Sequence, residues 1–480
     1  MMSDNLKSKT AKGLLWGGLG NGLMQILNLL FGVFLARLLS PGDYGIIGSL
    51  TIFSALAGIF SESGFILAIV NKKEVSDADF NAVFWFNVAM SLSIYTILWF
   101  CAPLISKFYS QPEMTALARF IFLGFVASAL SATPTAWFFR NLDVRTRSSV
   151  QIIALLLSGI GGVVAAFMGL GYWAIAIQTL LYTFCNSAIL WIRCPWRPGF
   201  SFSPSALRAL LPFSLKQLGV SLFTQFNNNI FSVLLGRFYG MRITGFYTQG
   251  NKWTAMGAST LTGMLNGVGQ PVLRQTIEDP DRTARIFRRL LRFTCLVGFP
   301  AMFGLAIVAK EVIILLITDK WLPSVIIMQI LCIGGAFLPI STLYGNLFNS
   351  LGRPGTYMWN TIALGLCQLG CLCFSWRLGL ELMLAIYSIV NIIWVGVWEW
   401  FACRAGVISF RQALADILPY LIFTAIAMGA AIAAAWSIAS PLLSLMIKIA
   451  VATIIYIAQI RFFQPAFFAE ALAFLRRKRP

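Results

Sequence analysis

The chain contains no histidine and few charged residues of either sign. Charged residues make up 11% of its 480 residues, whereas a soluble domain carries about 25%. The absence of histidine removes the most common general base and metal ligand. The nine cysteines are odd in number and lie mostly within apolar stretches, which argues against a disulfide framework or a zinc site. We therefore expect no catalytic residue, no metal and no cofactor.

Apolar residues fill the sequence instead, at 58%. A window of about 20 residues finds about 14 apolar stretches joined by short polar loops. These stretches cover residues 13–38, 44–69, 81–106, 115–139, 149–169, 172–193, 208–236, 243–272, 292–317, 323–350, 356–377, 381–403, 416–438 and 441–463. The expected fold class is an all-α polytopic membrane protein with about 14 transmembrane helices.

The basic residues, which give a net charge of +19, lie in alternate loops. Sets of arginines follow the fourth, sixth and eighth apolar stretches and end the chain, while the loops around Gly169 and Ser440 carry no charge. This is the positive-inside pattern, and it predicts that both termini are cytoplasmic. The same charge attracts anionic membrane lipids, and we expect no nucleic-acid partner.

The loop after the eighth stretch contains two further patterns. Four arginines recur at helical spacing, which indicates either a basic amphipathic helix on the membrane surface or a solvated loop: Arg282, Arg285, Arg289 and Arg292. Asp279 and Asp281 resemble a DxD motif of sugar-nucleotide enzymes, but no catalytic domain surrounds them.

An internal repeat relates the first two stretches to the seventh and eighth at an ungapped offset of 200 residues. The matched pairs are Gln25 with Gln225, Asn28 with Asn228, Arg37 with Arg237, and Gly45 with Gly245. Six stretches separate the two copies, so both enter the membrane in the same direction and the repeat is parallel. This predicts an N-terminal six-helix lobe over residues 1–200, a C-terminal six-helix lobe over 201–412, and two extra helices with a basic cytoplasmic tail over 413–480.

Polar side chains form stripes along three of the repeat-related stretches. The members are Asn21, Gln25, Asn28 and Gly32 in the first, Gln217, Ser221, Gln225, Asn228 and Ser232 in the seventh, and Gln249, Lys252, Met256, Ser259 and Gly263 in the eighth. Such stripes can provide hydrogen bonds between helices, with small residues permitting close packing. They can equally line a hydrated cavity between two lobes. We favour the cavity because two of the stripes occupy matching positions.

Charged side chains within the apolar stretches support the same interpretation. A Lys or Arg in mid-bilayer costs about 2.5–3.5 kcal/mol on insertion scales, so it tends to face a cavity or a partner. We assign Lys216, Lys252 and Glu62 to the cavity. Arg37 and Arg237 close the outer ends of their helices, and anchoring at the membrane interface is an equal alternative for them.

Glu62 is also the candidate coupling or gate residue. Glu62 and Lys216 are both expected in the cytoplasmic half of the membrane, where a pair between the lobes would close an inner gate. The alternative is that each hydrogen-bonds within its own lobe. Lys448, which lies outside the repeat, is expected only to extend its ammonium group toward the interface.

Four short motifs, taken in their order and spacing, resemble a known family. They are residues 35–45 (LARLLSPGDYG), residues 63–65 (SGF) through 71–77 (NKKEVSD) followed by 84–87 (FWFN), residues 197–202 (RPGFSF), and residues 319–321 (DKW). The chain resembles the polysaccharide repeat-unit flippases (Wzx type, polysaccharide transport family). These belong to the superfamily that also holds the multidrug MATE exporters and the lipid II flippase. It is most similar to the colanic acid exporter branch.

The resemblance implies a non-enzymatic protein of the bacterial inner membrane, with two six-helix lobes around a cationic cavity. Such a protein flips undecaprenyl-pyrophosphate-linked oligosaccharides to the periplasmic leaflet and is coupled to an ion gradient. The implied partners are this lipid-linked glycan, membrane lipids, and the polysaccharide polymerase and chain-length proteins. In that setting four cations could neutralise phosphate or acidic sugars: Lys216, Lys252, Arg37 and Arg237. Five amides could hydrogen-bond the glycan: Gln25, Asn28, Gln225, Asn228 and Gln249.

Two other function classes stay open. A MATE-type exporter of small molecules uses an intramembrane carboxylate in the first helix of a lobe. The first and seventh stretches have none, so only Glu62 supports this option. A membrane glycan polymerase, ligase or glycosyltransferase needs a large external loop or a cluster of catalytic acids, and every outer loop here is short.

Overall fold

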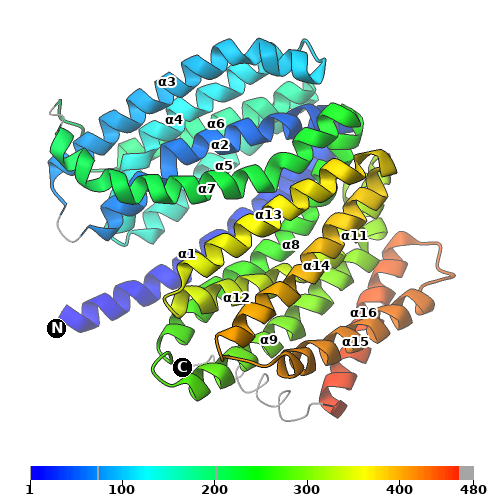
Figure 1. The fold of residues 1–480 in the computed structure, drawn as a ribbon. Helices are drawn as coiled ribbons and strands as arrows, with labels where there is room; N and C mark the ends of the chain where they lie inside the picture. The colour runs from blue at the N-terminus through cyan, green and yellow to red at the C-terminus, as the bar shows by residue number, and fades with distance from the viewer. Residues whose placement is uncertain (1, 73–74, 201–202, 464–480) are drawn as a thin grey trace. The chain divides into compact units, whose positions relative to one another are not determined.

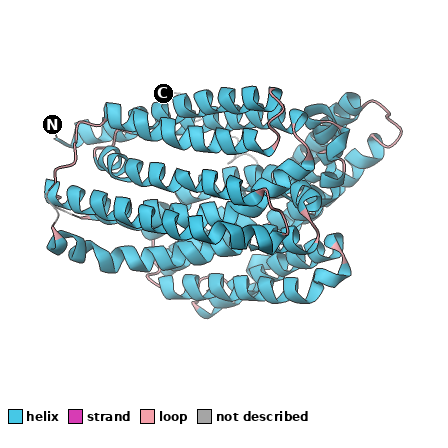
Figure 2. Cartoon of the chain, turned by 90° about the horizontal axis from the view of Figure 1, so that it is seen from above, coloured by secondary structure: helices cyan, strands magenta, loops and turns pink. Residues whose placement is uncertain are grey.

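The computed structural model describes residues 2–72, 75–200 and 203–463. Every regular element in these ranges is a helix (Figure 2). A search of the described residues finds 11 helices that are long and apolar enough to cross a membrane. The predicted all-α polytopic membrane fold is therefore confirmed.

The helix bounds follow the predicted apolar stretches. The first eight helices are α1 (Met2–Leu38), α2 (Pro41–Asn71), α3 (Asp77–Tyr109), α4 (Met114–Arg140), α5 (Val144–Phe167), α6 (Tyr172–Arg193), α7 (Pro204–Phe238) and α8 (Met241–Arg274). The remaining α-helices are α9 (Pro280–Ile307), α10 (Ala309–Ile317), α11 (Pro323–Gly335), α12 (Leu338–Ser350), α13 (Pro354–Ser375), α14 (Leu380–Arg404), α15 (Phe410–Ala434) and α16 (Pro441–Phe463). The ninth stretch corresponds to α9 and α10 together, and the tenth to α11 and α12.

Proline and glycine set many of these boundaries. Six helices (α2, α7, α9, α11, α13 and α16) begin at a proline, whose fixed φ suits the first helical position and whose missing N–H is not needed there. At the end of α12, Gly352 adopts a φ of +70°. The next residue, Arg353, donates its N–H to the carbonyl of Phe348 at 2.9 Å, which closes the helix end.

The chain divides into two compact units, Met1–Thr248 and Gln249–Pro480. In the first unit α3 packs on α4, α5 on α6, and α7 lies along α2 (Figure 1). Helix α1 packs on α5, where a Cβ built on Gly159 would overlap the ring of Phe31. Small residues thus permit the close packing of membrane helices. The units divide within α8 because α7 packs against α2, whereas the lobe boundaries at residues 200 and 412 come from the repeat and stay a prediction.

In the second unit, α9 packs on α11 and α15, α11 on α14, and α15 on α16 (Figure 1). Helix α10 packs on α16, where the Lys448 ammonium lies 2.6 Å from Glu311 Oε1 and 2.9 Å from the carbonyl of Ile307. The Ser444 hydroxyl donates to the same Glu311 oxygen at 2.8 Å. Lys448 is therefore half of a buried ion pair, and the expectation that it extends to the interface was wrong.

The arginine-rich segment is the beginning of α9. Asp279 is the N-cap of this helix, since its Oδ1 accepts the backbone N–H of Arg282 at 3.0 Å. Arg288 and Arg292 each lie 2.6 Å from the carboxylate of Asp416 on α15. The arginines thus belong to a helix that continues into the apolar stretch, and Asp279 has a structural role.

Candidate functional site

The repeat found in the sequence holds at the helix boundaries of the first compact unit. Helix α1 ends at Leu38 and α7 at Phe238, while α2 begins at Pro41 and α8 at Met241. Both pairs differ by the 200 residues of the sequence repeat. The matched polar residues therefore occupy equivalent positions on equivalent helices.

The first turns of α2 and α8 meet through a reciprocal glycine contact. A Cβ built on Gly45 would overlap the carbonyl oxygen of Met241, and a Cβ built on Gly245 would overlap that of Pro41. Gly45 and Gly245 are matched by the repeat, and so are Pro41 and Met241. The two backbones thus approach so closely that only glycine fits at either position. This explains a matched glycine pair that the sequence pattern alone did not explain.

Four of the predicted glycan-binding amides are accessible in the first unit. Gln25, Asn28 and Asn228 are exposed and Gln225 is half-buried. Within the described part of the chain, none of the four side-chain amides makes a hydrogen bond. If these stripes served to join helices, the amides would be bonded across a helix interface. Their availability supports the interpretation that they line a polar surface.

The two matched arginines lie in the last turns of α1 and α7 and are exposed. Arg237 donates to the carbonyl of Phe108 at 2.5 Å, and its guanidinium lies 5.2 Å from the centre of the Phe108 ring. These contacts fit the alternative role of Arg237, in which it anchors the end of its helix at the membrane interface. The side chains of Lys216 and Glu62 lie outside the described residues, so their pairing stays a prediction.

The second unit begins within α8 at Gln249, and the first turn after that point holds polar groups that have no partner among the described residues. Gln249 is 1% exposed, and its Oε1 accepts no hydrogen bond from any described residue. Lys252 is half-buried and forms no ion pair within the described ranges. Trp253, which the sequence analysis missed, is buried with an unbonded Nε1 one turn from Gln249. Unpaired polar groups in a membrane helix are costly, which marks this turn as a functional candidate.

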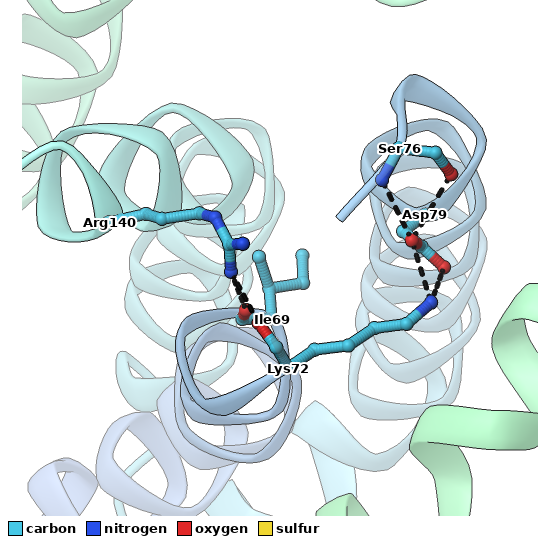
Figure 3. A network of polar contacts seen from close by, with 5 residues as sticks. All are labelled: Ile69, Lys72, Ser76, Asp79 and Arg140. Atoms are coloured by element: carbon cyan, nitrogen blue, oxygen red, sulfur yellow. Dashed lines mark hydrogen bonds and ion pairs between the residues drawn. The ribbon is translucent and has the colours of Figure 1, made fainter. Parts of the chain in front are cut away.

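The turn between α2 and α3 is locked by a network of charged side chains (Figure 3). Arg140, from the end of α4, donates to the carbonyls of Ile69 at 3.0 Å and Lys72 at 2.7 Å. Lys72 in turn pairs with Asp79 at 2.7 Å, and Asp79 accepts the backbone N–H of Ser76 at 3.0 Å. Arg140 therefore caps α2, while Ser76 and Asp79 cap α3.

The ion pair with Lys72 and the capping contacts with Ser76 give Asp79 a structural role at the start of α3.

A second motif that carried the resemblance is also structural. The backbone N–H of Gly199 donates to Asn81 Oδ1 at 2.9 Å, and its carbonyl accepts Trp85 Nε1 at 2.9 Å. The Trp85 ring stacks on Phe200 with centroids 5.8 Å apart. This motif fastens the segment after α6 to α3, so residues of two of the four motifs have structural roles.

Sequence reasoning missed three buried carboxylates of the second unit, Glu311, Glu399 and Asp416. They are 6%, 4% and 2% exposed, respectively. Each is an acidic residue within or at the edge of an apolar stretch, which is the signal that could have identified them. Glu311 and Asp416 have basic partners in the structure, whereas Glu399 has none among the described residues.

Comparison with known proteins identifies the family. Residues 34–326 match the family described as "Polysaccharide biosynthesis protein". The chain is 23% identical to the lipopolysaccharide biosynthesis protein WzxC of Escherichia coli K12, over 73% of this chain and 71% of the relative. It is 21% identical to the teichuronic acid biosynthesis protein TuaB of Bacillus subtilis 168, over 88% of each chain.

Among solved structures, the chain shares its fold with the lipid II flippase MurJ in an inward closed conformation. The TM-score is 0.74 at 14% identity, over 94% of this chain and 98% of that structure. These findings confirm the resemblance proposed from the four motifs. The chain therefore belongs to the polysaccharide biosynthesis protein family.

Proposed function

We propose that this protein is a flippase for polysaccharide repeat units in the bacterial inner membrane. Its substrate would be an undecaprenyl-pyrophosphate-linked oligosaccharide, of the colanic acid type or related to it, moved from the cytoplasmic to the periplasmic leaflet. The observation that carries the proposal is the set of unbonded amides at repeat-matched positions on α1 and α7, in a chain of the polysaccharide biosynthesis protein family.

The chemistry of such a substrate matches the residues. Its polyprenyl tail can stay in lipid, its pyrophosphate needs cations, and its sugar hydroxyls need amide partners. We assign the hydroxyls to Gln25, Asn28, Gln225, Asn228 and Gln249, and the phosphates or acidic sugars to Lys216, Lys252, Arg37 and Arg237. A neutral hydrogen bond contributes about 0.5–1.5 kcal/mol net, so several amides can hold a glycan without trapping it.

Transport against a gradient needs an energy source, and we propose that an ion gradient supplies it. A two-lobed transporter exposes a central site alternately to either side of the membrane. Coupling requires that the ion and the substrate favour different conformations. Glu62 stays the sequence-based candidate for the ion-sensitive gate.

The two other classes are less well supported. A drug exporter gives no reason for two repeat-matched pairs of amides, and its expected carboxylate is absent from the first and seventh apolar stretches. A polymerase or ligase needs catalytic acids beside a substrate, whereas Glu311 and Asp416 have basic partners within their unit.

Deletion of the gene tests the proposal. We expect lipid-linked oligosaccharide to accumulate in the cytoplasmic leaflet, where an enzyme or lectin added outside spheroplasts cannot reach it, and we expect the wild-type gene to reverse this. Accumulation in the periplasmic leaflet would favour a polymerase or ligase. An unchanged pool together with a changed sensitivity to cationic drugs would favour the exporter.

A further inference from the structure

Glu399 of α14 is a buried carboxylate that the proposed glycan site does not use. Its side chain is 4% exposed, and its Oε1 accepts no hydrogen bond from the described residues. Glu311, a glutamate of similar burial in the same unit, pairs with Lys448 and accepts a hydrogen bond from Ser444. The two glutamates thus differ in partners more than in burial.

Among the described residues, no charged group forms an ion pair with Glu399. Asp416, on the neighbouring helix α15, binds Arg288 and Arg292 of α9, at 2.6 Å each. On α14 itself, the guanidinium of Arg404 lies 4.0 Å from the centre of the Trp400 ring. The other titratable groups on α14 and on the segments that pack against it are Cys332 on α11, Tyr344 on α12, Tyr357, Cys367, Cys371 and Cys373 on α13, Arg377 just before α14, Glu381, Tyr387 and Cys403 on α14, and Arg411, Asp416 and Tyr420 on α15. No cation within the described ranges compensates a charge on Glu399.

A buried hydroxyl lies on α12, which packs against α14. Tyr344 is fully buried, and its hydroxyl makes no hydrogen bond to any described residue. Its ring is fixed 5.1 Å from that of Phe287 on α9. Two neighbouring helices thus each hold a buried group, an acid and a hydroxyl, that has no partner among the described residues, and such a core can hold and exchange a proton.

An uncompensated charge at this depth is costly, so the carboxyl is stable in its neutral form. We propose that Glu399 is a proton-binding site in the second compact unit. One carboxylate oxygen takes up a proton from water and forms the neutral acid of this conformation. A conformation that admits water, or that brings a cation close, returns the proton to water. This deepens the proposed function, on which its transport role rests, by naming a group that could carry the coupled proton.

Carbodiimide labelling of the full-length protein in native membrane vesicles tests the site directly. Hydrophobic carbodiimides modify carboxylic acids that are protonated in apolar surroundings, and mass spectrometry locates the adduct. Glu311 is the internal control, because it has similar burial and a basic partner. We expect Glu399 to be labelled several times faster than Glu311 at neutral pH, and its labelling to slow as the pH rises. Equal rates at the two glutamates, or no adduct on Glu399, would overturn the proposal.

A substitution tests the coupling separately. Glu399→Gln mimics the neutral acid, so we expect the thermal stability of the protein to be unchanged and glycan export to lose its response to collapse of the proton gradient. Glu381→Gln, on the exposed first turn of the same helix, is the matched control and should behave as wild type. Export by Glu399→Gln that responds as in wild type would remove the coupling role. The two proposals can fail separately. If Glu399 is labelled but deletion of the gene leaves the pool of lipid-linked glycans unchanged, the proton-binding site is supported and the flippase function is rejected.

Discussion

Gly45 of α2 lies directly against the carbonyl oxygen of Met241 on α8. The repeat-related residue Gly245 lies against the carbonyl of Pro41 in the same way, so the contact is reciprocal. Two helix starts that the repeat matches are thereby fixed to each other by their backbones.

Alanine at either glycine should weaken this crossing. For Gly45→Ala and Gly245→Ala we expect a loss of about 1–3 kcal/mol of stability, because the added methyl group must displace backbone and not a flexible side chain. Thermal unfolding of the purified protein in detergent measures the effect. Gly42→Ala is the matched control, since its Cβ would lie 3.6 Å from the Ser40 hydroxyl and the helix gains from the exchange. Equal melting temperatures for Gly45→Ala and Gly42→Ala would contradict the close approach.

The stripe amides should matter for transport and not for stability. Gln225→Ala removes a side-chain amide that bonds to no described residue, so we expect reduced glycan export at an unchanged melting temperature. By contrast, the Gln368 amide donates to Asn391 Oδ1 at 3.0 Å within the core of the second unit. Gln368→Ala should therefore cost about 1–3 kcal/mol of stability, because it leaves Asn391 buried without its partner. A stability loss of the same size for Gln225→Ala would indicate that this stripe joins helices.

Two lysines of the second unit should respond in opposite ways. Lys252→Ala removes an ammonium that pairs with no described residue, and we expect normal protein levels with reduced export, which Lys252→Arg should partly restore. Lys448→Ala leaves the Glu311 carboxylate buried without a cation, at a cost of about 3–5 kcal/mol, so we expect poor accumulation of folded protein. Quantitative immunoblots beside an export assay separate the two effects. Normal export by Lys252→Ala would remove the main support for a cationic binding surface.

The membrane orientation stays a prediction from the basic loops. Reporter fusions at Pro480 should report a cytoplasmic C-terminus, and fusions at the uncharged loop near Ser440 should report the periplasm. A periplasmic signal at Pro480 would reverse the sidedness assigned to every candidate residue.

Hydropathy and spacing predicted the helices well, because an apolar stretch of membrane length has few structural alternatives. The repeat likewise predicted that Gln25 and Gln225 occupy equivalent helix positions. Partner choice was not predictable in the same way. Glu311 and Lys448 are 137 residues apart, and no local pattern indicates that these two helices touch. The compact units divide at Thr248 and the lobe boundaries at residues 200 and 412 stay a prediction, since packing such as that of α7 along α2 is not visible in a repeat.

The network at the α2–α3 turn has a consequence for the order of events during synthesis. The carbonyl of Ile69 is capped by Arg140, which follows it by 71 residues. At translation rates of about 5–20 residues per second, the ribosome adds that arginine about 4–14 s after the end of α2 has been made. During this interval the end of α2 is without its cap, and water or other surrounding groups have to satisfy its carbonyls. The basic residues that are predicted to orient these helices also complete them, so exchanging Arg140 or Lys72 to reverse the topology would leave the α2–α3 turn without its capping contacts.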